Sequence, residues 1–381
     1  MPAMAIVDVL MPVYNAAAYL TDALRSIQAQ TVQDIRIIVV DDGSTDGTEE
    51  LVLEARKNDP RIVYLYQENA GIVAALNAGL DLCTAPFLAR MDGDDISCPD
   101  RFQRELAYLS DNPGCIAVSC VAHHIDETGK RTGTSSRRKD VATADPFSLP
   151  ADEPYLLHPM LMARLEAVKS VGGYRPIYNA EDSDLYWRLS HVGRLHVLPE
   201  YLGEYRVHSN SLSSASIRNG RLLAVWSQLA ALSAQRRSSG QPDFPFGPAI
   251  AHDVARQKTL AAMVETVMPH LSHAEGVWYR SAVSAKLIEL CYYRPYEPDA
   301  EDIQFILEAA AHDREIASRK KYDVFREGIL SASIRLLMAK RYRDAFALTA
   351  PERWPVLIAR TMFRVALPES VKTRIKTSLR R

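Results

Sequence analysis

The feature that most constrains the fold is a regular alternation, in the first half of the chain, of short apolar runs with segments of helical spacing. Four runs rich in β-branched residues each precede such a segment, and they lie at 7–13, 36–42, 61–67 and 86–92. Strands that alternate with helices build a mostly parallel sheet, because each connecting helix packs over the sheet and returns the chain to the same end. The sequence therefore predicts an α/β fold with helices on both faces of the sheet.

Each of these predicted strands ends in polar residues. Tyr14 and Asn15 follow the first strand, the segment 41–48 follows the second, Asn69 follows the third, and the segment 92–95 follows the fourth. Parallel strands bring their carboxyl ends to one edge of the sheet, and ligands of such sheets bind at that edge. The polar segments therefore predict a single long cleft.

The most acidic of these segments is Asp92-Gly93-Asp94-Asp95, which places three carboxylates within four positions. Like charges this close repel one another unless a cation holds them. Asp92 and Asp94 are two residues apart, so in extended chain they project to the same side. Mg²⁺ and Mn²⁺ are typically held by a few carboxylates together with phosphate oxygens. A solvated turn is the alternative for such a triplet, and the neighbouring polar segments favour the cation site.

Strands are absent from the predicted pattern after Ser214. Helical spacing continues at 218–236, 249–268, 275–291, 300–325 and 328–349. We expect two domains, an α/β domain over 1–214 and a helical domain over 215–381, and a length of 381 residues suits two domains. The polar, irregular segment 133–152 is expected to form a surface loop or lid.

The net charge and the cysteine content limit which partners and which cellular compartment the sequence suggests. The net charge of −2 gives no reason to propose nucleic acid as a partner. The five cysteines lack metal-ligand spacing and lie in apolar segments, which predicts buried, reduced thiols of a cytosolic protein. The start of the sequence does not resemble a signal peptide, and no apolar run approaches the ~20 residues that a membrane-spanning helix needs. We therefore expect a cytoplasmic protein.

The C-terminal end is basic, in contrast to the rest of the chain. Residues 352–381 carry eight Lys or Arg against two Glu, a charge of +6, which leaves −8 for the other residues. Apolar side chains are interspersed with these charges, at Trp354, Leu357, Ile358, Met362, Phe363 and Val365. Such a segment can lie in the interface of an anionic membrane, or it can be an ordinary amphipathic helix followed by a basic tail. Both interpretations stay open, and a lipid-linked substrate would favour the first.

Seven segments, taken in order, carry a family resemblance. They are MPVYN, VVDDGSTDGT, ENAGIVAALNAGL, RMDGDDISCPDRF, HPMLMARLEAVKSVGGY, AEDSDLYWRL and YRVHSNSLS. Together they resemble the motifs of family 2, a large class of inverting nucleotide-sugar glycosyltransferases with the GT-A fold. The match covers roughly residues 4–214, and the ordered set is specific, whereas each segment alone is not. The resemblance implies a GT-A domain followed here by a C-terminal helical region.

The resemblance implies a site for a nucleoside diphosphate sugar. Its donor-binding residues would be Pro12, Tyr14, Asn15, Asp41, Asp42, Asn69, Asp92 and Asp94. Within this set, Asp41 would read the base and Asp42 would lie close to the ribose. Asp92 and Asp94 would form the metal-binding Asp-x-Asp that holds Mn²⁺ or Mg²⁺ on the diphosphate, with Asp94 the better candidate. His208 would reach the same metal or diphosphate, and Asp95 would turn away to support the loop.

The resemblance also implies the catalytic group. Asp182 matches the catalytic base of the family, although an acidic residue at a helix start can equally serve the helix dipole. Glu181 and His158 are candidates for the acceptor side of the site, although His158 can equally be a loop histidine hydrogen-bonded to the backbone. One position departs from the family pattern, because Leu76 stands where an arginine is common. A phosphate contact expected from that helix is therefore missing or supplied elsewhere.

The expected reaction is a single displacement. One carboxylate base without a nucleophile predicts inversion, as the acceptor oxygen attacks the anomeric carbon while a metal stabilises the departing diphosphate. We expect transfer from a UDP- or dTDP-sugar to a hydroxyl of a glycan or lipid-linked glycan, in cell-surface polysaccharide synthesis. The alternatives are a nucleotide-sugar-binding scaffold without turnover and a nucleotidyltransferase. The latter needs a glycine-rich basic loop after the first strand, and MPVYNAAAY does not provide one.

Overall fold

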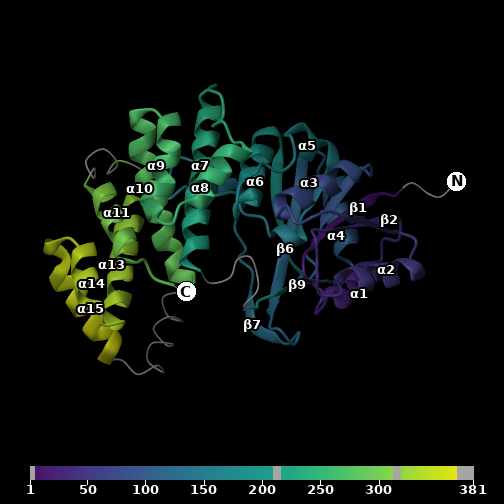
Figure 1. Ribbon diagram of the computed structural model, residues 1–381, viewed down its shortest axis with the longest axis horizontal. Helices are drawn as coiled ribbons and strands as arrows, with labels where there is room; N and C mark the ends of the chain where they lie inside the picture. The colour runs from purple at the N-terminus through teal and green to yellow at the C-terminus, as the bar shows by residue number, and fades with distance from the viewer. Residues whose placement is uncertain (1–4, 209–215, 295, 312–317, 319, 367–381) are drawn as a thin grey trace. The chain divides into compact units, whose positions relative to one another are not determined.

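The computed structural model describes residues 5–208, 216–294, 296–311, 318 and 320–366. The chain divides into two compact units. The first takes the segments 1–146, 151–214 and 229–252, and the second takes the segments 147–150, 215–228 and 253–381. Figure 1 labels the helices and strands of both units.

The first unit is built on a nine-stranded sheet in the order β3-β2-β1-β4-β8-β6-β9-β5, with β7 paired to β6. The strands are β1 (Val7–Val13), β2 (Ile35–Asp41), β3 (Ile62–Tyr66), β4 (Phe87–Arg90), β5 (Ile96–Ser97), β6 (Cys115–Ile125), β7 (Arg131–Ser135), β8 (Met162–Arg164) and β9 (Arg194–Arg206). Strands β3, β2, β1 and β4 are parallel to one another. The prediction of a mostly parallel α/β sheet is thereby confirmed, and the antiparallel strands β5, β7 and β8 are additions to it.

Helices cover both faces of this sheet. They are α1 (Leu20–Gln28), α2 (Thr48–Asn58), α3 (Ile72–Leu82), α4 (Arg101–Asp111), α5 (Leu165–Ser170) and α6 (Glu181–Val192), with short 3-10 turns η1 (Val141–Thr143) and η2 (His158–Met160). Successive side chains of a strand point to opposite faces. Val9 of β1 accordingly joins a core with α1, α2 and α4, whereas Leu10 joins a second core with α3, α5 and α6. A Cβ at Gly79 of α3 would overlap Leu10, so the glycine lets α3 pack closely on β1.

Among its described residues the second unit contains helices and the turns between them but no strand, as the sequence predicts for this region. The helices with residues in this unit, of which α7 and α8 also have residues in the first unit, are α7 (Ile217–Ser238), α8 (Pro248–Arg256), α9 (Leu260–Val267), α10 (His273–Tyr293), α11 (Ala300–Ala310), α13 (Tyr322–Met338), α14 (Tyr342–Leu348) and α15 (Trp354–Ala366), with turns η3 (Met268–His270) and η4 (Pro351–Arg353). Among the described residues, no helix has the length and apolar character that crossing a bilayer requires.

Three helix predictions in this unit are wrong in detail. The predicted helix over 300–325 ends at Ala310, and a separate helix, α13, begins at Tyr322 after Lys321, which has a left-handed backbone with φ of 66°. The predicted helix over 249–268 is two helices, because the hydroxyl of Thr259 accepts the Ala262 N–H and starts α9 anew. The predicted helix over 328–349 ends at Met338, since Lys340 adopts a left-handed backbone with φ of 62°. Apolar spacing alone continues through such breaks, so the sequence pattern joined helices that the backbone separates.

All five cysteines are free thiols. Cys83, Cys115, Cys120 and Cys291 are buried, whereas Cys98 is partly exposed. The expectation of reduced, buried thiols is therefore met at four positions and only partly at Cys98.

Candidate active site

Three carboxylates converge where the chain leaves β4. Each of Asp92, Asp94 and Asp95 offers one oxygen, and these oxygens lie within 4.8 Å of one another. Asp92 and Asp94 are partly exposed, whereas Asp95 is buried. The sheet supplies this geometry, because the parallel pairing of β4 with β1 ends both strands at the same edge. Such a cluster presents the hard oxygen ligands that Mg²⁺ and Mn²⁺ prefer.

Three arginines hold the acidic loop in place. Arg90, only 3% exposed, forms an ion pair with Asp92. The backbone N–H of Arg206 donates to Asp95 at 2.8 Å, and its guanidinium donates to the carbonyl of Asp94 at 2.8 Å. Arg101 lies beneath the loop and donates to the carbonyl of Arg90 at 3.1 Å. The loop is thus fixed by its backbone as well as by its side chains.

His208 lies against the same carboxylates although it is distant in sequence. Its Nε2 is 2.8 Å from Oδ2 of Asp94, and its ring centroid is 5.2 Å from that of Tyr19. Burial and the charge of Asp92 raise the pKa of Asp94 above its ordinary value, while His208 lowers it. Burial and both neighbouring carboxylates raise the pKa of Asp95 further. Crowded carboxylates beside an imidazole fit a divalent cation, which would relieve their repulsion.

Asp41 and Asp42, at the end of β2, hold two loops together. Asp41 accepts the Ser44 N–H at 2.8 Å and the Tyr64 hydroxyl at 3.1 Å. Asp42 accepts the N–H groups of Ala70 and Gly71 at 2.9 Å and 2.8 Å. Both carboxylates are buried. The predicted base-reading and ribose-binding residues therefore also shape the loops at the carboxyl edge of the sheet.

The remaining predicted donor residues lie beside these loops. Asn15 has a left-handed backbone with φ of 48°. Its N–H donates to Ser44 at 2.9 Å, and its side-chain oxygen accepts the Thr45 N–H at 2.8 Å. Tyr14 is exposed, Pro12 is buried within β1, and Asn69 lies in the loop that Asp42 binds. The carboxyl ends of β1, β2 and β3 are thereby brought together as the sequence predicts.

Glu181 and Asp182 occupy the first turn of α6. Oδ1 of Asp182 accepts the Ser183 N–H at 2.7 Å, and the Ser183 hydroxyl donates to Glu153. Removal from water raises the pKa of Asp182 to about 6. Removal from water together with the charge of Asp182 raises the pKa of Glu181 to about 8. The carboxyl of Glu181 is therefore protonated more readily than that of Asp182.

His158 faces Tyr174 from the turn η2. Its Nε2 lies 2.8 Å from the Tyr174 hydroxyl. Burial and the charge of Arg90 lower the pKa of His158 well below its ordinary value, so the imidazole is neutral. Asn77 of α3 fixes Tyr174 by accepting its N–H at 2.9 Å and donating to its carbonyl at 2.8 Å. The predicted acceptor histidine is thus a buried side chain that is hydrogen-bonded to Tyr174.

Arg90 is a buried residue of the candidate site that the sequence did not point to. Its charge lowers the pKa of both Glu181 and Asp182, and it is paired with Asp92. Among the described residues, no hydrogen bond is made by its Nε. Leu76 is fully buried in the apolar core, so α3 presents no cation at that position. The only signal in the sequence was a single basic residue next to the acidic segment.

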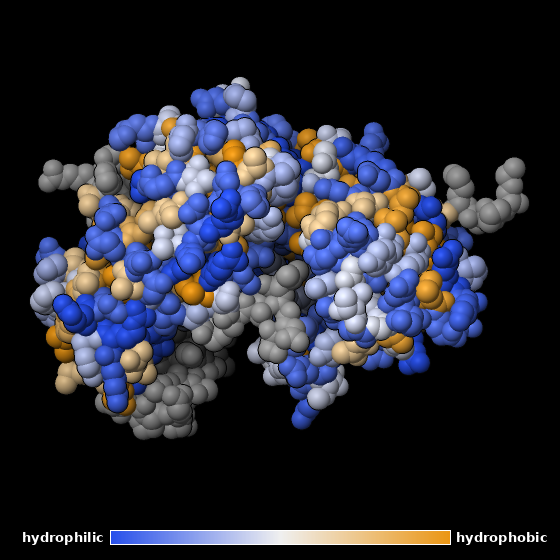
Figure 2. All heavy atoms as spheres, viewed as in Figure 1, coloured by the Kyte–Doolittle hydropathy of each residue, from blue (hydrophilic) through white to orange (hydrophobic). Residues whose placement is uncertain are grey.

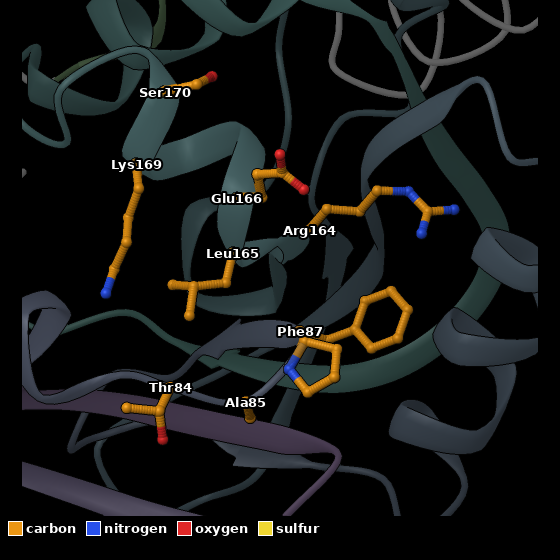
Figure 3. Close-up of a pocket in the computed structure, with 9 residues that line it drawn as sticks. Thr84, Ala85, Phe87, Arg164, Leu165, Glu166, Lys169 and Ser170 are labelled. Carbon is orange, nitrogen blue, oxygen red and sulfur yellow. The ribbon is translucent and has the colours of Figure 1, made fainter.

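A separate hollow of about 640 Å³ lies at the amino end of β4 (Figure 3). It is lined by Thr84, Ala85, Pro86, Phe87, Arg164, Leu165, Glu166, Lys169 and Ser170. Arg164 donates to the Cys115 carbonyl at 3.1 Å, and Lys169 donates to the Cys83 carbonyl at 2.8 Å. Its basic groups therefore serve the fold, and the hollow lies at the opposite end of β4 from the acidic loop.

Known proteins share this sequence pattern and fold. A family model described as Glycosyl transferase family 2 matches residues 8–172. An uncharacterized glycosyltransferase of Nostoc sp. is 31% identical over 224 residues, which cover 55% of this chain and 68% of that protein. The amylovoran biosynthesis glycosyltransferase AmsE of Erwinia amylovora is 29% identical over 210 residues, covering 54% of this chain and 78% of that protein.

The fold has a solved counterpart. The structure of S. aureus TarS in complex with UDP-GlcNAc superposes with a TM-score of 0.53 at 18% identity, covering 81% of this chain and 91% of that one. A mostly parallel sheet with acidic loops at its carboxyl edge, followed by a helical region, is the architecture of a GT-A type glycosyltransferase. The chain belongs to glycosyl transferase family 2 and is a transferase. The family resemblance of its motifs is thereby confirmed.

Proposed function

We propose that this chain is a metal-dependent, inverting glycosyltransferase of the hexosyltransferase type. It would move a sugar from a UDP- or dTDP-sugar to a hydroxyl of a glycan or lipid-linked glycan in cell-surface polysaccharide synthesis. The observation that carries the proposal is the meeting of the Asp92, Asp94 and Asp95 carboxylates at the carboxyl edge of the sheet. The names of AmsE and of the TarS complex with UDP-GlcNAc support the acceptor and donor classes.

The donor would lie along the carboxyl ends of β1, β2, β3 and β4. Its proposed pocket residues are Pro12, Tyr14, Asn15, Asp41, Asp42, Asn69, Asp92 and Asp94. Asp41 is proposed to read the base and Asp42 to lie close to the ribose. Because both carboxylates also hold the surrounding loops, the pocket is shaped by the residues that bind the donor.

Asp94, Asp92 and His208 would hold Mn²⁺ or Mg²⁺ at the diphosphate. A bound divalent cation stabilises the negative charge that develops on the leaving diphosphate. His208 positions Asp94 through its contact at 2.8 Å, and Arg90 positions Asp92 through their ion pair. Asp95 would support the loop by accepting the Arg206 N–H, although one of its oxygens also lies within 4.8 Å of those of Asp92 and Asp94.

Asp182 is proposed as the base that removes the proton of the acceptor hydroxyl. Its Oδ1 accepts the Ser183 N–H, which leaves Oδ2 for the acceptor. A pKa of about 6 keeps it ionised at neutral pH while it still accepts a proton readily. Glu181, with its proton, and His158, through Tyr174, are proposed to line the acceptor side. Direct attack by the activated oxygen on the anomeric carbon inverts its configuration.

Isothermal titration calorimetry with a panel of nucleotide sugars and Mn²⁺ tests the donor site. We expect saturable binding of at least one UDP- or dTDP-sugar, lost in Asp94→Ala and kept in Asp111→Ala, an exposed carboxylate at the end of α4. Hydrolysis or transfer should be lost in Asp182→Asn while donor binding persists. Unchanged turnover in Asp94→Ala would refute the metal assignment, and donor binding without turnover under any condition would favour the scaffold alternative.

The wider organisation is also proposed. We infer a GT-A domain over 1–214 and a helical domain over 215–381. A lipid-linked acceptor would be met at the inner face of the cell membrane, and we propose peripheral contact there through the C-terminal end of an otherwise cytoplasmic protein. The part of that end beyond residue 366 lies outside the described residues.

A further inference from the structure

Glu153 lies beside the first turn of α6, which carries the proposed base. Its Oε2 accepts a hydrogen bond from the hydroxyl of Ser183, 30 positions away in the sequence. The N–H of the same serine donates to Oδ1 of Asp182 at 2.7 Å. Ser183 is only 8% exposed, whereas Asp182 and Glu153 keep more of their surface exposed. One buried serine therefore joins a carboxylate from a distant segment to the carboxylate proposed as the base.

The segment before Glu153 fixes its backbone. The ammonium group of Lys139 donates to the carbonyl of Glu153 at 2.5 Å and forms an ion pair with Asp152. Asp145 and Asp152 exchange two backbone hydrogen bonds, at 2.8 Å and 3.0 Å. All these residues except Glu153 belong to the polar segment 133–152, which the sequence predicts only as a surface loop or lid. The segment thus holds in place the backbone from which the Glu153 side chain reaches α6.

Several charges act on Asp182 from the elements around it. Burial raises its pKa most strongly, the Ser183 N–H and the charge of Arg90 lower it, and the charge of Glu153 raises it. Glu153 therefore favours proton uptake by Asp182 and opposes the effect of Arg90. The other titratable groups that interact with Asp182 are Glu181 and Tyr186, both of α6, and Tyr174, which lies between α5 and α6.

The position of Asp182 gives Glu153 a role. Asp182 lies in the first turn of α6, and the start of a helix stabilises negative charge, which weakens a carboxylate as a base. We propose that Glu153 is a positioning residue for the base: through Ser183 it fixes the first turn of α6, and its charge makes Asp182 a stronger proton acceptor. A nearby like charge favours the protonated form of a carboxyl. This inference rests on the proposed function, because Asp182 serves transfer only if it is the base.

The test follows the protonation of Asp182 in the full chain, without any substrate. Selective ¹³C labelling of aspartate side chains reports their carboxyls by NMR, and Asp182→Asn identifies the Asp182 signal by its loss. The wild-type midpoint is expected at about pH 6. Glu153→Gln keeps an acceptor for the Ser183 hydroxyl but removes the charge, so the midpoint should move to lower pH by about half a unit or more. Arg90→Met should move it the opposite way.

Matched variants separate the charge from a merely structural contact. Glu153→Asp keeps the charge, so its midpoint should lie between those of the wild type and Glu153→Gln. Ser183→Ala keeps the N–H but removes the hydroxyl that holds Glu153, and should lower the midpoint by a smaller amount. Hydrophilic residues cover much of the face that Figure 2 shows, and water screens charges at such a surface. Glu166→Gln, which removes an exposed carboxylate of α5, should therefore leave the midpoint unchanged.

An unchanged Asp182 midpoint in Glu153→Gln would overturn the inference, even if turnover or the free energy of unfolding fell, because the contact would then be structural only. An equal movement in Glu166→Gln would overturn it too. If Glu153→Gln does not fold, Ser183→Ala decides in the same way. The proposed function fails separately: a midpoint that moves as expected in a chain that transfers no sugar would refute the base and leave the coupling of Glu153 to Asp182 standing.

Discussion

Replacing Arg90 by methionine should separate the chemistry of the site from the stability of the fold. The substitution keeps an unbranched side chain in a position that is 3% exposed, but removes the guanidinium paired with Asp92. The same charge lowers the pKa of Glu181 and of Asp182. Arg90→Met should therefore affect the acidic loop and the proposed base together, although Arg90 is itself neither the proposed base nor an acceptor-binding residue.

The size of the effect follows from burial. Removing one partner of a fully buried ion pair typically costs ~3–5 kcal/mol. The Asp92 side chain is 30% exposed, so water can partly replace the guanidinium. We expect a loss of about 2 kcal/mol in the free energy of unfolding. Without the positive charge, the pKa of Asp182 should rise above about 6, which moves the acid limb of kcat/KM to higher pH.

Arg36→Met is the matched control. Arg36 donates to the buried carboxylate of Asp8 at 2.7 Å, at the amino end of β1 and thus away from the carboxyl edge. Both variants should lower the free energy of unfolding measured by urea denaturation. Only Arg90→Met should weaken donor binding in calorimetry with Mn²⁺ and shift the pH profile, and Arg90→Lys should restore part of both. Equal losses of kcat/KM in the two methionine variants, with unshifted pH profiles, would refute the positioning role of Arg90.

Three further predictions concern Asp182, Glu105 and Gly79. In the wild type, kcat/KM should fall as the pH drops through about 6, because protonation inactivates the proposed base Asp182, and Asp182→Asn should be slower by roughly 10²–10⁴-fold with no such limb. Burial raises the pKa of Glu105 to about 8, so the folded chain holds a proton that the unfolded chain loses near pH 4.5. The free energy of unfolding should therefore decline between about pH 4.5 and 8, by at most ~5 kcal/mol, and Glu105→Gln should flatten that decline in urea titrations. Gly79→Ala should cost ~1–2 kcal/mol through overlap with Leu10, whereas Gly114→Ala, whose Cβ would meet open space, should cost little by thermal denaturation.

The sequence predicted those parts of the fold whose signal is local. Strands β1 to β4 lie within a residue or two of their predicted bounds, because apolar runs and flanking polar residues mark them directly. Strand β8 has three residues and β5 has two, too few for any periodic pattern. Their pairing with β4, β6 and β9 joins segments far apart in the chain. Pairing with distant strands, rather than a local sequence preference, therefore determines where β5 and β8 form.

The candidate site likewise contains contacts that sequence spacing predicts and contacts that only the tertiary fold creates. Asp92 and Asp94 are near neighbours in sequence, so their approach could be predicted from spacing alone. The contact of His208 with Asp94 spans 114 positions, and only the family resemblance suggested it. Arg90, Arg101 and Arg206 were missed because a basic residue in sequence does not reveal whether it faces solvent or a buried carbonyl. Their roles depend on the tertiary fold, as the donation of Arg101 to the Pro159 carbonyl at 3.1 Å illustrates.

The acidic loop is held in shape by the protein itself. Each carboxylate has a partner of its own: Asp92 pairs with Arg90, Asp94 contacts His208, and Asp95 accepts the Arg206 N–H. Within the described residues, Oδ2 of Asp95 has no hydrogen-bond partner although it is buried. Oxygens fixed in this way meet a ligand without rearranging, so little conformational entropy is lost on binding. A loop that relied on the cation for its shape would instead bind it more weakly, because ordering the carboxylates would oppose binding.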